Sequence, residues 1–419
     1  MVGKKARERR GIVVSLNYGA KEVVITGAGV VTPLECGKGI QAFWKKLCDG
    51  TNAVRPIKRF DVRGHKCGVG AEVFDFEPLL DDRWQENDLC AKLFALACQY
   101  ALQDAKVIKP LLRSAGVAVG TILGGISSGE QYMNERFFLF KKGLKRLLKQ
   151  YCLHTIADSV AKSFSLQGPV ISINTACCSG ADAIRSAAAQ IQNGRTTIML
   201  AGGVDVLSEF VFRGFSALNA LTTDGKVRPF DKGRTGLALG EGAGVVILEE
   251  KGHAYARRAK IYCRLAGAGS SADAFHMVRP QKEGEGLSRA ISAALLQVKG
   301  KTDAVDYICE HGTGTLYNDI MEAKAIKRVF AQKAYSIKIN SIKSIIGHTL
   351  GASSAIEAIN CIKSIESNTI APTINFQERD PECDLQYVVN TACEHNINMC
   401  ISLSAGFGGQ NTALVFSRA

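Results

Sequence analysis

The chain has 419 residues, and 52 lysines and arginines against 39 aspartates and glutamates give it a net charge of +13 at pH 7. Hydrophobic residues make up 46% and charged residues 22%, a globular composition that excludes a disordered, collagenous or coiled-coil chain. The sequence has no apolar run of about 18 residues, so no transmembrane helix is expected, and the length allows two or three domains.

The 14 cysteines are scattered, with no CxxC pair and no Cys/His group at metal-ligand spacing. We therefore expect no metal, and we interpret the cysteines as reduced thiols of a cytoplasmic protein. Residues 1–20 are basic and contain too short an apolar stretch for a signal peptide, so we expect a flexible basic extension there.

The first half of the chain alternates between strand and helix patterns. Strands are predicted at 21–33, which runs into a Gly-rich turn, at 116–125, at 169–174 as a buried strand, at 196–203 and at 242–250. Helices are predicted at 41–50, closed by Gly50, at 87–105, near 155–165 and at 181–194, capped by Asn193-Gly194.

The densest basic run lies in ERFFLFKKGLKRLLKQY, residues 135–151. Apolar residues between the charges predict an amphipathic helix with a basic face. An acidic protein, an anionic membrane or a nucleic acid could bind such a face, but a plainly solvated face is an equally good interpretation. No nucleic-acid-binding motif accompanies the run, so we expect no nucleic acid as a partner.

The second half repeats the alternation. A strand at 306–315 runs into a Gly-rich turn, a strand at 335–344 runs into a loop, a helix covers 351–365, and 399–416 forms a strand, a Gly-rich turn and a closing strand. The alternation predicts an α/β layered fold. VISINTACCSGADAIRSAAAQI and SIKINSIKSIIGHTLGASSAIEAINCI both pass from a strand ending in Ile-Asn to an Ala/Ser-rich helix. We therefore predict an internal duplication that brings the turns at Cys177 and His348 together.

Three residues in small-residue turns could carry nucleophilic chemistry. Cys177 in NTACCSG lies at a strand-to-helix turn, where free backbone N–H groups favour a thiolate. His311 ends a strand in EHGTGT, and His348 opens a helix in SIIGHTLGA. Each of them alone is more often a structural residue, but a cysteine with two histidines in this setting points to a Cys/His site.

These stretches resemble the β-ketoacyl-acyl-carrier-protein synthases, the elongating type II condensing enzymes of the thiolase-like superfamily. The resemblance covers residues 21–419, through VVITGAGVVTP, NTACCSG, GGVDV, RPFDKGRTG, LGEGAG, EHGTGTLYND, KSIIGHTLGA, APTIN and GFGGQN. It implies a five-layered α-β-α-β-α fold of two similar halves, which we place at 21–265 and 266–419. It also implies a homodimer that needs no cofactor and takes acyl and malonyl groups from an acyl carrier protein.

The resemblance assigns roles to individual residues. It implies Cys177 as the acyl-accepting nucleophile, with His311, His348 and Lys343 in the catalytic motifs. The implied supporting residues are Glu357, Asp319, Glu322 and the gating Phe407. The implied substrate contacts are Thr313, Thr315, Phe215, Leu123 and Gly408. The implied carrier-protein contacts are Lys141, Lys142, Lys145 and Arg146.

The chemistry of a decarboxylative condensation fits these residue types. The N–H of Cys177 and an N–H of the 406–409 turn could receive an oxyanion. Two neutral imidazoles donating to one oxygen would stabilise the enolate left by malonyl decarboxylation. Lys343 with Glu357 would hold a histidine and set its charge.

Several positions depart from the family pattern. Cys178 follows the nucleophile where many relatives have Ser or Thr, and Val278 stands where a pantetheine-binding Thr is common. Leu403 replaces a common Asn. The other departures, at the pocket rim and docking face, are Thr235, Leu237, Ala405, Gln85, Glu86 and Asn87. They favour a specialised elongase over the housekeeping enzyme of membrane lipid synthesis.

Two other functions compete with this interpretation. A chain-length-factor-like partner subunit keeps the fold but typically lacks the nucleophile, which is present here. A degradative thiolase typically uses a second cysteine near the C-terminus, where this chain has GFGGQN. DNA binding rests on net charge alone and is weaker than either.

Overall fold

The computed structural model describes residues 21–419, so the predicted basic extension at 1–20 lies outside the described residues. The first half contributes five main strands: β1 (Val23–Val31), β4 (Gly116–Gly120), β5 (Val170–Ile173), β6 (Ile198–Asp205) and β8 (Gly242–Glu250). The second half contributes six: β9 (Cys263–Ala272), β10 (Tyr307–Cys309), β11 (Lys338–Asn340), β13 (Gln386–Tyr387), β15 (Met399–Gly406) and β16 (Gln410–Ser417).

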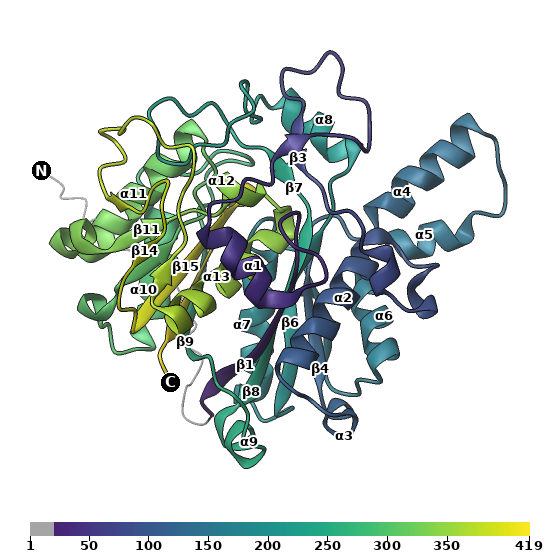
Figure 1. The fold of residues 1–419 in the computed structure, drawn as a ribbon, viewed down its shortest axis with the longest axis horizontal. Coiled ribbons are helices and arrows are strands. Elements are labelled where there is room, and N and C mark those ends of the chain that lie inside the picture. Colours follow the sequence, from purple (N-terminus) through teal and green to yellow (C-terminus); the bar gives the residue numbers. More distant parts are fainter. Residues whose placement is uncertain (1–20) are drawn as a thin grey trace, which may run out of the picture.

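These strands form one mixed sheet in the order β13-β11-β10-β15-β16-β9-β1-β8-β6-β4-β5 (Figure 1). The halves join where β1 and β9 pair antiparallel, Val24 with Arg264 and Ile25 with Cys263. Outward from this junction, β1, β8 and β6 are antiparallel neighbours and β6, β4 and β5 are parallel. The second half repeats the pattern, with β9, β16 and β15 antiparallel and β15, β10 and β11 parallel. The predicted duplication is therefore confirmed in the topology.

Helices cover both outer faces and fill the space between the half-sheets (Figure 1). Helices α2 (Leu89–Asp104) and α6 (His154–Phe164) pack on the outer face of the first half. Helices α10 (Glu285–Leu296) and α11 (Leu316–Phe330) pack on the outer face of the second half. Helices α7 (Ser179–Gln192) and α13 (Ser353–Ser367) lie between the two half-sheets. This is the predicted thiolase-like α-β-α-β-α arrangement.

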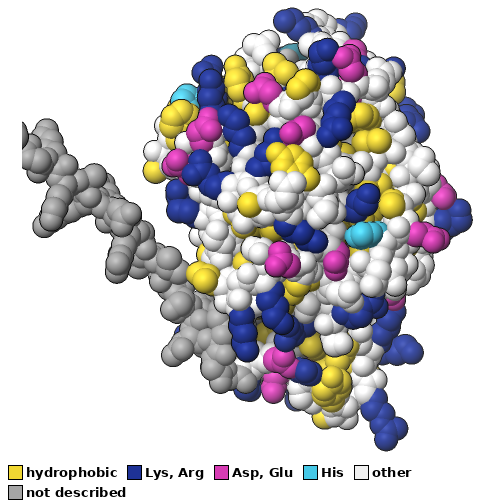
Figure 2. Space-filling model, turned by 90° about the vertical axis from the view of Figure 1, so that its left-hand side faces the viewer, with side chains coloured by type: hydrophobic (Ala, Val, Ile, Leu, Met, Phe, Trp, Pro, Cys, Tyr) yellow, Lys and Arg dark blue, Asp and Glu magenta, His cyan; other side chains and the backbone are white. Residues whose placement is uncertain are grey.

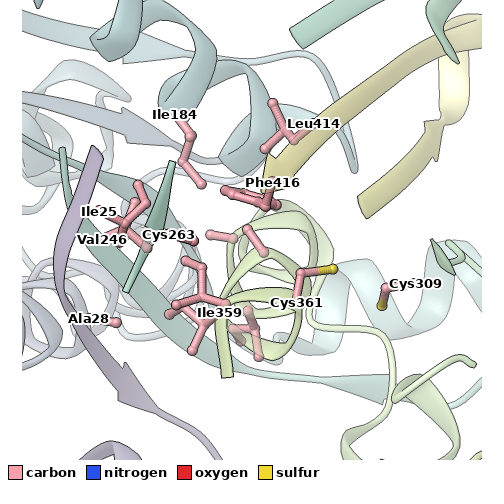
Figure 3. Close-up of a cluster of buried hydrophobic side chains, with 14 of the residues drawn as sticks. Ile25, Ala28, Ile184, Val246, Cys263, Cys309, Ile359, Cys361, Leu414 and Phe416 are labelled. Carbon is pink, nitrogen blue, oxygen red and sulfur yellow. The ribbon is translucent and has the colours of Figure 1, made fainter. Parts of the chain in front are cut away.

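The central layer holds the largest core. Ile184 of α7 and Ile359 of α13 pack with Val246, Leu414 and Phe416 of the two half-sheets (Figure 3). Small residues let the two helices approach closely, since a Cβ on Gly180 would lie only 2.9 Å from the Cβ of Ala355. The Ala/Ser-rich pattern of both helices therefore has a packing cause.

The remaining helices and short sheets surround this body. They are α1 (Gly39–Cys48), α3 (Lys109–Leu112), α8 (Glu209–Ala217), α9 (Lys251–Ala256) and α12 (Lys343–Ile346). Two small sheets are formed by β2 (Arg55–Pro56), β3 (Val69–Ala71) and β7 (Leu239–Gly240), and by β12 (Thr369–Ile370) and β14 (Cys393–Glu394). No helix among residues 21–419 is both long and apolar enough to cross a bilayer.

The amphipathic helix predicted in the basic run 135–151 is confirmed only over its end, residues 145–151, where Leu147 is buried. Helix α4 (Ile126–Met133) passes into a π-helical turn at Asn134–Phe138, and α5 (Lys145–Tyr151) begins only after an irregular stretch. The break falls where Phe140 and Gly143 take positive φ angles, which an α-helix cannot contain. The two helices form a hairpin that projects from the body (Figure 1).

Two predictions about strands were wrong. Gly27 and Gly29 lie inside β1 rather than in a turn, because α2 crosses the strand there and a Cβ on Gly29 would lie 2.1 Å from the carbonyl oxygen of Ala97. Strand β5 is an edge strand and not fully buried, with Val170 exposed and the rest intermediate. The predicted division after residue 265 falls inside β9, and we propose a division at 257–262, ahead of that strand.

Charges of both signs are mixed on the face of the second half that Figure 2 shows, with basic and acidic side chains side by side. This face carries no stripe of a single charge.

Candidate active site

A cavity of about 380 Å³ runs from the interior to the surface between α8, the turn after β10 and the turn between β15 and β16. Its buried end is formed by Cys177, His311 and His348, with 5%, 3% and 2% of their surfaces exposed. Its outer end includes Leu316 and Tyr317, which are both 55% exposed. The cavity therefore places the reactive side chains at its buried base and reaches the surface at its other end.

The three residues at the base come from three separate turns. Cys177 lies between β5 and α7, His311 follows β10, and His348 lies between α12 and α13. Nitrogen and sulfur atoms of the three side chains all lie within 4.8 Å of one another. The two imidazole rings are 5.1 Å apart between centroids and almost perpendicular, at 82°. The structure thus brings together the turns that the duplication predicted to meet.

The turn that carries Cys177 is fixed by short polar side chains. The Thr175 hydroxyl donates to Asp182 Oδ2 at 2.7 Å, and the Thr175 amide donates to Ser179 Oγ at 2.9 Å. Ala176 takes a positive φ of 52°. Gly406 of the facing turn lies so close that a Cβ there would be 3.1 Å from the Cys177 nitrogen. A larger residue at Gly406 would press on the turn that carries the thiol.

Burial raises the pKa of the Cys177 thiol to about 12, although Lys343 and the Phe407 backbone N–H act in the opposite direction. The sequence predicted instead a thiolate favoured by the start of a helix. That prediction was wrong because the thiol is fully buried and α7 begins only at Ser179. The resting residue is therefore a neutral thiol.

His348 is held in one tautomer. Its Nδ1 atom accepts from the Leu350 backbone N–H at 3.0 Å and lies 3.0 Å from the Ser353 hydroxyl. A backbone N–H can only donate, so the neutral ring carries its proton on Nε2. Burial, and then the charge of Lys343, lower the pKa of His348 well below its usual range. The ring is therefore a neutral donor at pH 7.

His311 is held in the same tautomer by Lys343. The Lys343 ammonium lies 3.2 Å from His311 Nδ1 and donates to the His311 carbonyl at 2.6 Å. It also pairs with Glu357, whose pKa burial raises to about 7. Burial, Lys343 and His348 together lower the pKa of His311 well below its usual range.

The distances among Cys177, His311 and His348 would suit a metal ion, but the tautomers do not. A metal-binding histidine offers a lone pair on one nitrogen and donates from the other. Here Nδ1 of His348, the nitrogen away from the cavity, faces a backbone N–H donor. Nδ1 of His311 faces the ammonium group of Lys343. Both rings therefore present N–H groups, rather than lone pairs, to the cavity.

Acidic residues hold the turn that follows His311. Glu322 accepts from the backbone N–H groups of His311 and Gly312, both at 2.7 Å. Asp319 accepts from the N–H of Gly314 at 3.2 Å. Beyond this turn, the hydroxyls of Thr313 and Thr315 lie 2.9 Å apart on the cavity wall.

The predicted gating residue Phe407 and the predicted substrate contacts divide into those that line the cavity and those that do not. Phe407 stacks on Phe215 at 5.4 Å between ring centroids and 16° between planes, and both line the cavity. Gly408, with a φ of +78°, donates its N–H to the Met277 carbonyl at 2.7 Å and does not line the cavity. Leu123 does not line it either, since it lies against a different part of the core.

The predicted docking residues lie apart from the cavity, on the α4–α5 hairpin. Lys141 and Lys142 are exposed in the stretch between the helices, and Lys145 and Arg146 begin α5. Lys141 lies 3.5 Å from Glu135, and Arg146 pairs with Glu86 at 2.6 Å. The acidic residue that departs from the family pattern at position 86 thus offsets part of this cluster.

The sequence interpretation missed part of the cavity wall. Asp273, His276 and Arg279 line it from one loop, and Asn411 donates to Asp273 Oδ1 at 2.7 Å. Asn411 ends the quoted motif GFGGQN and could have been included on that signal. The departures Val278, Thr235, Leu237 and Ala405 all line the cavity too.

Two family models match the chain. One, the N-terminal domain of beta-ketoacyl synthase, matches residues 20–254, and the other, the C-terminal domain of beta-ketoacyl synthase, matches residues 262–377. A 3-oxoacyl-[acyl-carrier-protein] synthase 2 from Synechocystis sp. is 36% identical over 96% of this chain and 99% of its own length.

A polyketide relative and a solved complex are similar over the same length. A putative polyketide beta-ketoacyl synthase 1 from Streptomyces halstedii is 35% identical over 95% of this chain and 98% of its own. The solved AntDE:AntF structure contains a type II PKS acyl-carrier protein in complex with its ketosynthase bound to the hexaketide. It matches with a TM-score of 0.88 and 33% identity, over 96% of this chain and 100% of the matched chain.

Proposed function

The chain belongs to the β-ketoacyl synthase family of condensing acyltransferases, and on that premise we propose how its residues divide the reaction. Cys177 accepts an acyl group from an acyl carrier protein. His311 and His348 decarboxylate a malonyl group held on a second carrier protein, and the two groups condense to a 3-oxoacyl product. One observation carries the proposal: a buried thiol and two neutral imidazoles meet at the base of a single cavity.

In the first step, the Cys177 sulfur attacks the thioester carbonyl carbon. The N–H groups of Cys177 and Phe407 receive the oxyanion. The C–S bond of the incoming thioester then breaks, and the departing pantetheine sulfur takes the proton that Cys177 loses. This transfer suits a neutral thiol, because no free thiolate has to exist in the buried site beforehand.

In the second step, the malonyl thioester oxygen lies between the Nε2–H groups of His311 and His348. The C–C bond to the carboxylate breaks, carbon dioxide leaves, and its electron pair forms an enolate that the two N–H groups stabilise. Neutral imidazoles suit this role, since they donate without giving up a proton. Lys343 and Leu350 hold the rings for this purpose.

In the third step, the enolate carbon attacks the acyl carbonyl on Cys177. The oxyanion returns to the N–H groups of Cys177 and Phe407 and collapses as the C–S bond to Cys177 breaks. The sulfur leaves as a thiolate and takes from water the one proton that the overall decarboxylative condensation consumes. Phe407, stacked on Phe215, lies at the entrance to this site. Movement of Phe407 would admit an acyl chain.

We further propose that the enzyme acts as a homodimer joined through β5. The strand is an edge of the sheet and leaves Val170 42% exposed, whereas the sequence pattern is that of a buried strand. Antiparallel pairing with β5 of a second copy would continue the sheet and cover the strand. Light scattering that finds only monomer at micromolar concentration would contradict the dimer.

We also propose that the protein works in a reducing compartment such as the cytoplasm, because all 14 cysteines of the chain are free.

The function is tested with the purified chain alone. Incubation with acyl-carrier thioesters of varied chain length should add one acyl mass to the intact protein, and the Cys177→Ser variant should gain none. Malonyl-carrier protein should then release carbon dioxide and give a 3-oxoacyl-carrier product. A wild-type chain that neither acylates nor decarboxylates would instead be a non-catalytic partner subunit.

A further inference from the structure

Arg279 stands at the exposed end of the cavity without an ionic partner. It lines the cavity, and among residues 21–419 no carboxylate forms an ion pair or hydrogen bond with its guanidinium group. Arg328 of α11, by comparison, lies 3.8 Å from Glu285. A guanidinium carries five N–H donors in a planar fork, so an unpaired one at a cavity mouth is suited to a planar or tetrahedral anion.

An aromatic ring supports this guanidinium. The Arg279 Cζ atom lies 5.9 Å from the ring centroid of Tyr317, which also lines the cavity, at the start of α11. A cation placed over an aromatic face is held there electrostatically while its N–H groups stay free at the edge. Arg279 and Tyr317 therefore link the loop after β9 to the start of α11.

The loop that carries Arg279 is tied down along its length. Asp273 Oδ2 accepts from the Gln281 N–H at 3.0 Å, and His276 Nδ1 accepts from the N–H groups of Val278 and Arg279 at 3.1 and 3.2 Å. Gly408 donates to the Met277 carbonyl, which fastens the loop to the turn beside Cys177. Arg279 thus projects from a loop that is fixed relative to the thiol.

The position of Arg279 separates it from the reacting carboxylate. His311 and His348 lie at the buried base, where the malonyl group reacts under the proposed function, whereas Arg279 is exposed at the other end of the cavity. The substrate arm that connects a thioester to a carrier protein ends in a phosphate. That phosphate is the anion at the outer end of such an arm.

We propose that Arg279, supported by Tyr317, binds the phosphate of the phosphopantetheine arm that delivers the acyl or malonyl thioester. This inference rests on the proposed function, since it names the substrate group bound at the mouth of that site. The charged contact takes the place of the neutral hydrogen bond that a threonine at position 278 would give, because Val278 has no polar side chain. The enzyme should therefore discriminate substrates by their phosphate.

Two small thioesters that differ only in this group test the proposal: malonyl-pantetheine and malonyl-phosphopantetheine. The wild-type enzyme should have the lower KM for the phosphorylated one. Arg279→Met, which keeps the apolar stem, should raise that KM about tenfold or more and leave the KM for malonyl-pantetheine nearly unchanged. Arg279→Lys and Tyr317→Phe should keep most of the preference.

Lys282→Met is the matched control, since it removes one positive charge from the same loop outside the cavity wall. It should leave both KM values unchanged. Malonyl-CoA and malonyl-carrier protein, tested in parallel, separate the shared phosphate from the rest of each donor. If only the carrier-protein KM rises in Arg279→Met, Arg279 contacts the protein surface and the proposal is overturned.

The remaining outcomes are equally decisive. If Arg279→Met raises both small-substrate KM values alike, the side chain acts by packing at the mouth and the phosphate role is wrong. If wild type has no preference between the two thioesters, the phosphate is not bound. If wild type decarboxylates neither thioester nor the carrier-bound substrate, the proposed function fails first, and this result is distinct from the others.

Discussion

The turn after β5 and the turn after β11 occupy equivalent places in the two halves, yet they hold their functional side chains by different means. Cys177 follows β5 almost at once and lies among small side chains and backbone amides. In the second half the short helix α12 intervenes before His348. Its neighbours include the buried Lys343–Glu357 pair.

The difference extends to the surroundings of each turn. Around His311 the second half buries three more carboxyl groups completely, those of Glu310, Asp319 and Glu322. The duplicated topology therefore supplies two converging turns, and the side chains give them different chemistry. A thiol can be placed by packing alone, whereas an imidazole that must stay neutral and point one N–H into the cavity needs fixed charges and donors around it. We therefore expect substitutions that change side-chain size to impair the Cys177 turn most. Substitutions that change charge should impair the histidine turns most.

Substitution of the two adjacent cysteines, Cys177 and Cys178, should give the largest difference in activity. Cys177→Ser should lose acylation and condensation almost entirely, because a hydroxyl is a far weaker nucleophile in this buried place. Cys178→Ser should fold and keep most activity, since the Cys178 thiol faces the carbonyls of Ser404 and Gln410 at 3.4 Å, where a hydroxyl can donate. Peptide mapping after treatment with an acyl donor reads the modified site. An acyl group on Cys178 would overturn the assignment.

The histidines test the second half. His311→Ala or His348→Ala should lower malonyl decarboxylation by roughly 10²–10³-fold or more, the usual loss for one donor to a developing oxyanion. Acylation of Cys177 should survive at least in part, because it depends on the thiol and the backbone N–H groups. Carbon dioxide release and intact mass measure the two steps separately. A variant that decarboxylates at the parental rate would show that its residue is not an enolate donor.

A substitution of Lys343 tests whether its charge keeps the His311 ring neutral. Lys343→Met removes the ammonium group that lowers the pKa of His311, so that pKa should rise toward its usual range. The ring then protonates at higher pH, and the acid limb of the decarboxylation rate against pH should move upward. A ring of ordinary pKa stays mostly neutral at pH 7, so the loss of rate should be largest below about pH 6.5. An unchanged pH profile with a lower rate would mean that Lys343 only packs against the ring.

The α4–α5 hairpin is a feature of the first half without a counterpart between β10 and α11 in the second. Reversing Lys141, Lys142 and Lys145 to glutamate should raise the KM for carrier-bound substrate several-fold, because carrier proteins are acidic. A pantetheine thioester should react almost as before. An equal loss with both substrates would point to misfolding or to a different docking face.

The smallest expected effect is on stability against pH. Burial raises the pKa of Glu322 to about 8 and that of Glu310 well above its usual range. An unfolded chain releases these protons above about pH 4.5, while the folded chain keeps them, so the free energy of unfolding should fall as the pH rises toward 8. Glu310→Gln should flatten this decline by a few degrees in Tm between about pH 6 and pH 9. An unchanged slope would show that Glu310 is not protonated in the folded state.

Much of the fold was predictable from the sequence because strand and helix periodicities recur in the same order in both halves. The prediction of a turn at Gly27 and Gly29 was wrong because glycine is required both in tight turns and where a helix crosses closely over a strand. The exposure of β5 could not be predicted from its apolar residues, because the composition of a strand does not show whether it lies at the edge or inside a sheet.

The reactive residues of the candidate site were predicted from the sequence, but their electrostatics and part of the cavity wall were not. The motifs pointed to Cys177, His311 and His348, but no pattern indicated that burial would raise the thiol pKa. The Asp273–Gln281 loop escaped notice because its order comes from contacts with a turn far along the chain, through Gly408 and Asn411. Such contacts leave no local signal.

The position of α7 also determines when the molecule can be finished during synthesis. The apolar face of this helix is covered by α13 and β16, which the ribosome makes last. A nascent chain that has completed only its first half would hold α7 on one side of its sheet with Ile184 uncovered. Gly406, which precedes the last strand, also lies against the Cys177 turn, so the turn has all its neighbours only after β16 has been made.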